Sequence, residues 1–123
     1  MVEVERLKIE NYLVKLRFNS FALRNFSNGS FGFVGTVLTN GGRSYEIAIV
    51  LPSSYPNEAP KAYPVSPKLR SDVHMYPDGS MCLSLPEDWS AEKTVVTVIG
   101  WISHWLHNYE IYNEKGVWPA RGV

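Results

Sequence analysis

Residues 31–51 read FGFVGTVLTNGGRSYEIAIVL, and this stretch decides the fold. It holds two runs of alternating residues on either side of the segment Asn40-Gly41-Gly42. The alternating positions are Phe31, Phe33, Gly35 and Val37 in the first run, and Tyr45, Ile47, Ile49 and Leu51 in the second. A period of two is typical of half-buried β-strands, and an Asn-Gly step favours the positive φ of a hairpin turn. The stretch therefore predicts two antiparallel strands joined by a turn.

Segments on both sides extend this sheet. Residues 18–26 are rich in aromatic side chains and end at a further turn signal, Ser27-Asn28-Gly29-Ser30. Residues 61–65 supply one more short strand after the central stretch. The sequence thus predicts an antiparallel β-meander of about four strands.

The chain before the sheet predicts an amphipathic helix over residues 2–17. Its apolar residues alternate with Glu, Lys and Arg at roughly helical spacing, and they are Val2, Leu7, Ile9, Leu13 and Leu16. The cations of this helix form either a solvated face or a docking surface, and they are Arg6, Lys8, Lys15 and Arg17.

The chain after the sheet predicts a second helix over residues 93–112. Apolar residues recur there at 4-3-4-3 spacing, at Val95, Ile99, Ile102, Leu106 and Tyr109. Val98, Trp101 and Trp105 widen this face, so the helix is expected to be buried against the sheet and to stop at Gly116. Two helices packed on one antiparallel sheet make an α+β fold.

Composition limits the classes of partner and compartment. The 123 residues fit a single domain, and Lys plus Arg equal Asp plus Glu at 12 each. A formal charge of zero gives no global attraction to nucleic acid or to acidic lipid. One cysteine rules out an internal disulfide, and we find no secretory signal and no apolar run of membrane-spanning length. We expect an intracellular, cytoplasmic protein that binds neither nucleic acid nor membrane.

Residues 67–92 form a long segment with the composition of a loop, and it contains Cys82, the single cysteine. A loop of this length inside a small domain is usually functional. A cysteine thiolate attacks acyl groups well, and a thiol is a good leaving group, so Cys82 is the candidate nucleophile. The alternative is a buried and inert thiol.

Two motifs carry a resemblance to a known family. The first is residues 55–61, YPNEAPK, and the second is residues 74–83, HMYPDGSMCL, followed by Trp89. Together they resemble the ubiquitin-conjugating enzymes, which have Tyr-Pro and a later Pro after the third strand. Those enzymes then have a His-Pro-Asn motif, a Gly three residues before the catalytic Cys, a Leu after it and a Trp farther on. The resemblance implies a ubiquitin-conjugating-enzyme-like domain over residues 1–123, with Cys82 as thioester carrier.

One departure concerns the His-Pro-Asn motif, because His74 stands where the family has its Asn. Three roles stay open for His74: a donor to the oxyanion of thioester aminolysis, a base, or an anchor of the loop. Residues 105–110 and 116–118 are instead similar to bacterial members from antiphage (CBASS-type) operons. That likeness implies a cargo protein with an activated C-terminus, either a ubiquitin-like protein or a cGAS-like nucleotidyltransferase. An activating enzyme is a further expected partner.

Supporting roles fall to residues around Cys82. Asp78 and Gly79 are expected to shape a turn, with positive φ at Gly79, and Tyr76 either packs beside it or covers the thioester, with packing preferred. Glu87 and Asp88 are either solvated acids or groups that deprotonate or steer an incoming lysine. Trp89 is expected to anchor the loop after Cys82 to the core.

No cofactor or metal is expected. The sequence lacks a Gly-rich phosphate loop, and the pair His104 and His107 has no Cys/His cluster around it. Two other functions fit the same residues: a non-catalytic binding module of this fold, and a cysteine hydrolase with His74 as base.

Overall fold

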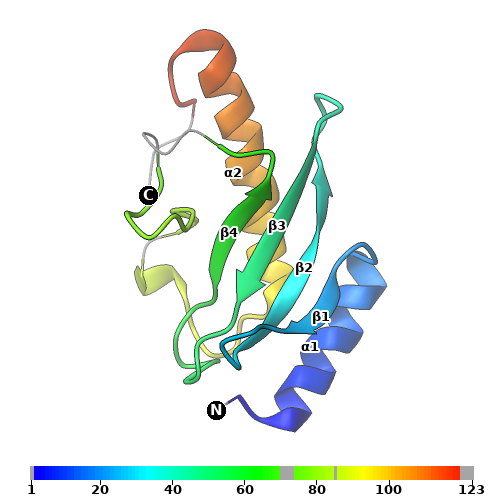
Figure 1. Cartoon of the computed structure of the whole chain (residues 1–123). Coiled ribbons are helices and arrows are strands. Elements are labelled where there is room, and N and C mark those ends of the chain that lie inside the picture. The colour runs from blue at the N-terminus through cyan, green and yellow to red at the C-terminus, as the bar shows by residue number, and fades with distance from the viewer. Residues whose placement is uncertain (1, 70–73, 85, 120–123) are drawn as a thin grey trace.

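The computed structural model describes residues 2–69, 74–84 and 86–119. Helix α1 comes first along the chain, four strands follow, and helix α2 is the last element (Figure 1). The elements are α1 Val4–Arg17, β1 Ala22–Asn25, β2 Phe31–Leu38, β3 Ser44–Val50, β4 Lys61–Ser66, the 3-10 turn η1 Pro86–Asp88 and α2 Val95–Lys115. The predicted α+β order is confirmed, and no helix in the described ranges is long and apolar enough to cross a membrane.

The four strands form one antiparallel sheet in the order β1-β2-β3-β4. Phe33 of β2 pairs with Ile49 of β3, and Ile49 pairs with Ala62 of β4. These three residues are fully buried, so one row of neighbouring side chains runs across the sheet into the core. The predicted meander is therefore confirmed together with its inward-facing positions.

The first strand is shorter than residues 18–26, the predicted range. The N–H of Phe18 still donates to the Val14 carbonyl at 2.7 Å, so Phe18 belongs to the end of α1. Phe21 is buried and packs on β2 at Gly35, where a Cβ atom would lie only 2.4 Å from the Phe21 ring. The aromatic residues before β1 therefore fill the core rather than extend the sheet.

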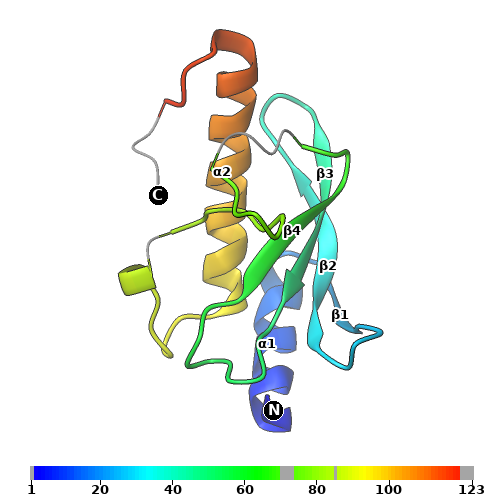
Figure 2. The ribbon, with the colours of Figure 1, turned by 60° about the vertical axis from the view of Figure 1, so that its left-hand side comes forward.

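Helix α2 runs along one face of the sheet (Figures 1 and 2). All five residues of the 4-3-4-3 pattern are buried, and Leu106 and Ile102 are fully so. The helix ends at Gly116, whose φ of 78° lies in the left-handed region that favours glycine. Burial and the stop are both confirmed, although the helix begins two residues later and ends three residues later than predicted.

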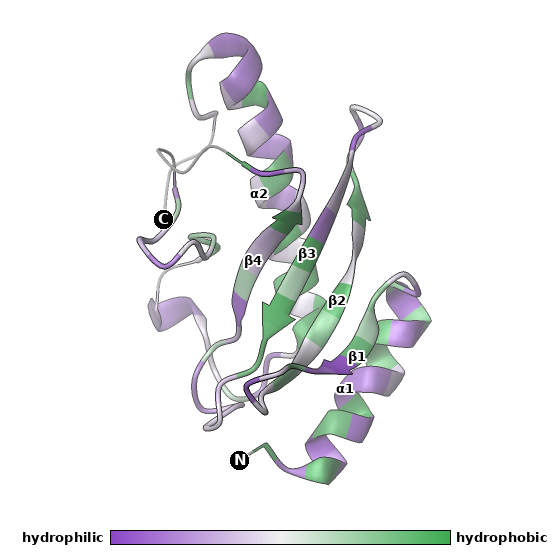
Figure 3. Ribbon diagram, in the orientation of Figure 1, coloured by the Kyte–Doolittle hydropathy of each residue, from purple (hydrophilic) through white to green (hydrophobic). Residues whose placement is uncertain are grey.

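The predicted apolar face of α1 is partly wrong. Ile9 and Leu16 are exposed by 53% and 64%, whereas Val14 and the charged Glu10 are fully buried. Hydrophobic and hydrophilic residues alternate along this helix in Figure 3. Apolar residues occur on more than one side of α1, so their spacing alone does not identify the packed face.

A polar network explains the burial of Glu10. Its carboxylate accepts hydrogen bonds from Arg6 Nε at 2.9 Å, from the Tyr55 hydroxyl, and from the N–H of Val95 at 2.9 Å. Val95 is the first residue of α2, and its N–H has no partner within that helix. The Glu10 carboxylate of α1 therefore satisfies this N–H at the start of α2. Burial, and then the Glu10 contact, raise the pKa of Tyr55.

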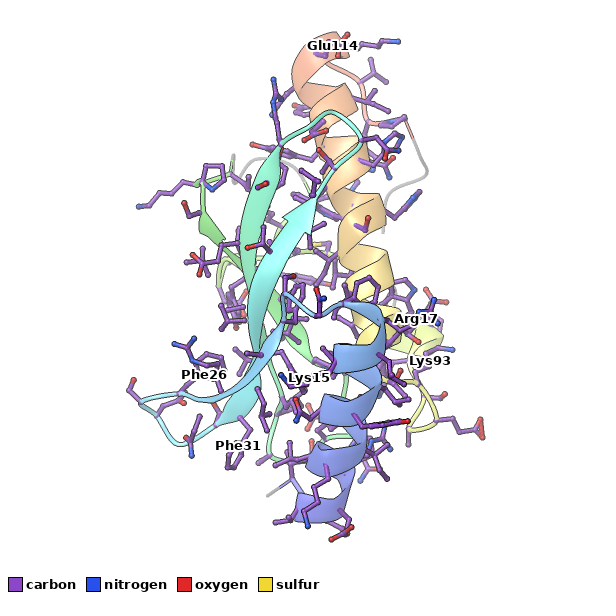
Figure 4. All side chains as sticks on the ribbon, turned by 90° about the vertical axis from the view of Figure 1, so that its right-hand side faces the viewer. Lys15, Arg17, Phe26, Phe31, Lys93 and Glu114 are labelled. Atoms are coloured by element: carbon purple, nitrogen blue, oxygen red, sulfur yellow. The ribbon has the colours of Figure 1, made fainter. Side chains whose placement is uncertain are left out.

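Arg6 completes this junction and is not a solvated cation. It donates to the backbone carbonyl of Lys93 at 2.7 Å and to that of Ala91 at 3.2 Å. Figure 4 shows Lys93, in the segment before α2, beside α1. Lys8, Lys15 and Arg17 are exposed on α1, and their predicted role in docking an activating enzyme stays a prediction.

Candidate functional site

Cys82 lies at the end of a short hairpin that follows β4. The two arms of this hairpin pair at Met75 and Met81, and the N–H of Tyr76 donates to the Ser80 carbonyl at 2.8 Å. At the open end, the N–H of Cys82 donates to the His74 carbonyl at 2.9 Å. The backbones of Cys82 and His74 are therefore directly opposite each other.

The tip of the hairpin is the turn Tyr76-Pro77-Asp78-Gly79. The N–H of Gly79 donates to the Tyr76 carbonyl at 2.9 Å, and Gly79 has a φ of 90°. The predicted positive φ is confirmed. An L-residue rarely adopts this conformation, so glycine keeps the turn free of strain.

Asp78 fixes the same turn through its charge. Its carboxylate accepts from the Ser80 hydroxyl at 2.6 Å, from the Ser80 N–H at 2.9 Å and from Lys61 Nζ at 3.0 Å. The Ser80 hydroxyl, then the Ser80 amide, then Lys61 hold the pKa of Asp78 far below its usual value. Asp78 therefore stays ionised, and the prediction that it shapes the turn is confirmed.

Two contacts hold the hairpin between β4 and α2 (Figure 2). The N–H of Met81 donates to the Ala62 carbonyl of β4 at 2.9 Å, and Trp105 Nε1 of α2 donates to the His74 carbonyl at 3.1 Å. The His74 carbonyl thus accepts from both Cys82 and Trp105. A main-chain hydrogen bond thus fixes the hairpin of Cys82 to the sheet, and a hydrogen bond from the Trp105 side chain fixes it to α2.

The thiol of Cys82 is only 8% exposed and is protonated at neutral pH. Burial raises its pKa, a hydrogen bond from the Tyr76 hydroxyl lowers it, and the charge of Asp78 raises it. Tyr76 is 47% exposed, so the packing role, one of the two expected for it, is not observed. Its hydroxyl contacts the Cys82 thiol instead.

Two cavities lie near the hairpin, and Cys82 itself lines the small one. The large cavity has a volume of about 550 Å³, and its apolar walls include Pro60, Met81, Leu83, Trp89, Val98 and Trp101. Lys61, Tyr76 and Asp78 also line it. The small cavity has about 120 Å³, and its walls include Cys82, His74, His104, Asn108, Trp105 and Trp118. Trp101 and Leu83 belong to both, so they form the partition between the cavities.

His74 has an unusual backbone and a stacked ring. Its φ of 47° lies in the left-handed region, where histidine is enriched among non-glycine residues. The ring centroid lies 4.2 Å from that of Trp118, which follows the end of α2. The backbone of His74 anchors the hairpin, while its ring lines the same cavity as Cys82. Both the anchoring role and a chemical role are thus compatible with its place.

Glu87 and Asp88 lie outside this arrangement. They belong to η1 and are exposed, and neither lines the large or the small cavity. Trp89 follows them and donates from Nε1 to the Pro56 carbonyl at 2.8 Å, with its ring 5.9 Å from that of Tyr55. The anchoring role of Trp89 is confirmed.

Three residues of the small cavity belong to segments already noted in the sequence, but nothing there placed them beside Cys82. His104 and Asn108 come from α2, and Trp118 comes from the segment after it. Their spacing of four shows that His104 and Asn108 share one side of a helix, but nothing local indicates that this side faces Cys82. Within the described residues, no three metal-binding side chains cluster.

Comparison with known proteins identifies the family. Residues 10–123 match the family model described as "Type II CBASS E2 protein", so the chain belongs to that family. Ubiquitin-conjugating enzyme 15 of Arabidopsis thaliana is 38% identical over 68 residues, which are 54% of this chain and 40% of the plant enzyme. The chain therefore matches less than half of the length of that relative. The function common to these matches is ubiquitin-conjugation-like.

A solved structure supports the same fold. The Vps23 UEV domain, solved in complex with ubiquitin, superposes with a TM-score of 0.61 and 17% sequence identity. The match covers 84% of this chain and 81% of the UEV chain. Helix α1, the four-stranded sheet and α2 thus form a fold similar to that of a UEV domain.

Proposed function

Because the chain belongs to the type II CBASS E2 family, we propose that it carries an activated protein C-terminus as a thioester on Cys82. It then transfers the acyl group to an amine. The observation that carries the proposal is the position of Cys82, held opposite His74 by a backbone hydrogen bond and lining a cavity. An inert core cysteine needs neither.

Loading begins from a protonated thiol. Burial raises the pKa of Cys82, so its proton must leave as the sulfur attacks the activated carbonyl carbon of the cargo. The hydrogen bond from the Tyr76 hydroxyl stabilises the thiolate that forms. The bond to the previous leaving group breaks, that group departs with the electron pair and takes up the thiol proton directly or through water, and the new carbon–sulfur bond links the cargo to Cys82.

Transfer then passes through a tetrahedral oxyanion. An amine attacks the thioester carbonyl, and the negative charge moves to the carbonyl oxygen before the Cys82 thiolate leaves. A preorganised N–H donor at that oxygen stabilises the transition state. The ring of His74 lines the cavity beside Cys82, so we assign it this donor role.

The expected partners follow from the family and the fold. The cargo is a ubiquitin-like protein or a cGAS-like nucleotidyltransferase with an activated C-terminus, in a bacterial antiphage system. The large cavity has the volume and the apolar walls to receive side chains near that C-terminus. The exposed cations of α1, Lys8, Lys15 and Arg17, are the proposed contact for an activating enzyme.

The competing function is a binding module of the same fold. A UEV domain solved with ubiquitin is among the similar structures, so binding of a ubiquitin-like protein without chemistry fits the architecture. The two functions differ at Cys82: a carrier needs the thiol, whereas a binding module does not.

The test is formation of a covalent adduct. The cargo is supplied as a C-terminal thioester of 2-mercaptoethanesulfonate, so no activating enzyme is required. Wild-type protein should form a 1:1 adduct that dithiothreitol cleaves, detected by intact mass spectrometry. Cys82→Ser should give a more stable oxyester, and Cys82→Ala should give none. An adduct that persists in Cys82→Ala, or its absence from wild type, contradicts the carrier function.

A further inference from the structure

The small cavity beside Cys82 is lined by nitrogen-bearing side chains. His74 reaches it from the hairpin, and His104 and Asn108 reach it from α2. Trp105 also lines the cavity, but its Nε1–H is already bonded to the His74 carbonyl. The polar groups left for a ligand in this cavity are therefore the two imidazoles and the carboxamide.

Asn108 differs from the two histidines in its burial. It is 5% exposed, whereas His104 is exposed and His74 is half-buried. Asparagine is a poor residue for a helix interior, and a buried carboxamide loses its water. Neither helix stability nor core packing accounts for an asparagine at this position of α2.

The carboxamide has a hydrogen to spare. Asn108 Nδ2 lies 3.2 Å from His104 Nε2, four residues earlier on the same helix. In the part of the chain that the structure describes, this is the one hydrogen bond of the Asn108 side chain. An amide nitrogen carries two hydrogens, so one can bind His104 while the second is free to face the cavity.

The walls make such a donor effective. Trp101, Trp105 and Trp118 surround the polar groups with aromatic surface. Trp118 packs on Trp105 with ring centroids 5.4 Å apart, and on His74 at 4.2 Å. Beside aromatic surface of low polarity, a fixed dipole acts more strongly on a developing charge than it does in bulk water.

We propose that Asn108 donates its free amide hydrogen to the carbonyl oxygen of the acyl group on Cys82. This inference rests on the proposed function and adds a second donor to it. His104 is a positioning residue, because the Nδ1–H tautomer of its ring accepts the other amide hydrogen at Nε2 and fixes the carboxamide. The acyl oxygen thus lies in the small cavity, between donors from the hairpin and from α2.

Transfer from Cys82 begins with attack of the amine on the acyl carbon. The lone pair of a neutral amine forms the carbon–nitrogen bond, and the carbonyl π electrons move to oxygen, where Asn108 and His74 donate hydrogen bonds. The carbonyl re-forms, the carbon–sulfur bond breaks, and its electron pair leaves with Cys82 as thiolate. The surplus proton of the nitrogen passes to water or to the thiolate. Asn108 exchanges no proton.

The test uses a small acyl probe. N-acetylglycine thioester of 2-mercaptoethanesulfonate acylates Cys82, excess probe is removed, and discharge to hydroxylamine is followed by intact mass spectrometry. Asn108→Leu keeps the size of the side chain and removes the donor. We expect discharge to slow by about 100-fold or more, as for other single oxyanion donors. Asn108→Asp should slow it at least as much, because a carboxylate repels the oxyanion.

Alkylation by iodoacetamide separates a donor from a structural residue. That reaction consumes the Cys82 thiolate but forms no carbonyl oxyanion, so Asn108→Leu should alkylate at the wild-type rate. His107→Ala is the matched control, since His107 is an exposed histidine of α2 outside the small cavity, and its discharge should be unchanged. Discharge at the wild-type rate in Asn108→Leu, or an equal loss of alkylation, overturns the inference.

Two other results are conceivable: wild-type Cys82 is not acylated, or Asn108→Leu does not fold. If wild-type Cys82 is not acylated at all, the proposed function fails, and the Asn108 assignment fails with it. If Asn108→Leu does not fold, the measurement moves to His104→Ala, an exposed position. Loss of the positioning hydrogen bond should slow discharge by about 5-fold, the value of one neutral hydrogen bond. A wild-type discharge rate in His104→Ala overturns the inference in that case.

Discussion

The two cavities beside the hairpin of Cys82 differ in size and in chemistry. The large cavity is mostly apolar and has an ion pair, Lys61 with Asp78, at its wall. The small cavity has a fifth of that volume and presents imidazole and carboxamide groups between tryptophans. The first suits side chains of an incoming polypeptide, and the second suits a single oxygen atom on which charge develops. We infer that the large cavity binds the cargo polypeptide and that the small cavity stabilises the charge on the acyl oxygen.

The largest expected effect concerns the helix that walls both cavities. Leu106 of α2 is fully buried, so Leu106→Ala should lower the free energy of unfolding by about 2–5 kcal/mol. Urea denaturation measures the change. Leu16→Ala is the control, because Leu16 is 64% exposed and its truncation should cost little. Equal effects of the two substitutions would contradict the packed role of α2.

The second prediction tests the charge-stabilising side. His74→Ala should slow discharge of preloaded enzyme by about 100-fold or more, with a smaller effect on loading. His74→Asn should recover part of the rate, because an amide N–H can replace that of the imidazole. Single-turnover discharge is measured beside the melting temperature. If loading, discharge and melting temperature fall together, His74 only anchors the loop. The assignment of charge stabilisation by His74 to the small cavity is then wrong.

The smallest effect is expected at the large cavity. The hydrogen bond from Tyr76 lowers the pKa of Cys82, so Tyr76→Phe should raise that pKa and move the alkylation profile to higher pH. Iodoacetamide alkylation at pH 7 should slow by about 5-fold, the value of one net hydrogen bond. Tyr63→Phe is the matched control. It also removes a tyrosine hydroxyl, but that hydroxyl contacts Asp78 at 3.3 Å and not Cys82. A profile shifted to lower pH in Tyr76→Phe would show that the contact favours the neutral thiol.

Site residues that act within their own hairpin could be predicted from the sequence, whereas those that depend on packing between elements could not. Gly79 and Asp78 were predictable because turn geometry depends on neighbouring residues, and both act within their own hairpin. The sequence leaves Tyr76 either to pack or to cover the thioester, and only the orientation of the turn brings its hydroxyl to the thiol. Asn108 lies within residues 105–110, which carry the resemblance to the bacterial members, but nothing local indicates that its side of α2 faces the cavity beside Cys82.

The sequence by itself determined the element order, the register-compatible alternation of β2 and β3, and the burial of α2. These follow from hydrophobic periods of 2 and 3.6, which the chain carries locally. Only the tertiary structure decided which side of α1 is buried, since Glu10 enters the core when Arg6, Tyr55 and Val95 come together to satisfy its charge. Only the tertiary structure brought His74 and Asn108 to one cavity beside Cys82. Glu10 is far in sequence from Tyr55 and Val95, and Asn108 lies 26 positions after Cys82. Contacts over such separations depend on packing, so no local hydrophobic period indicates them.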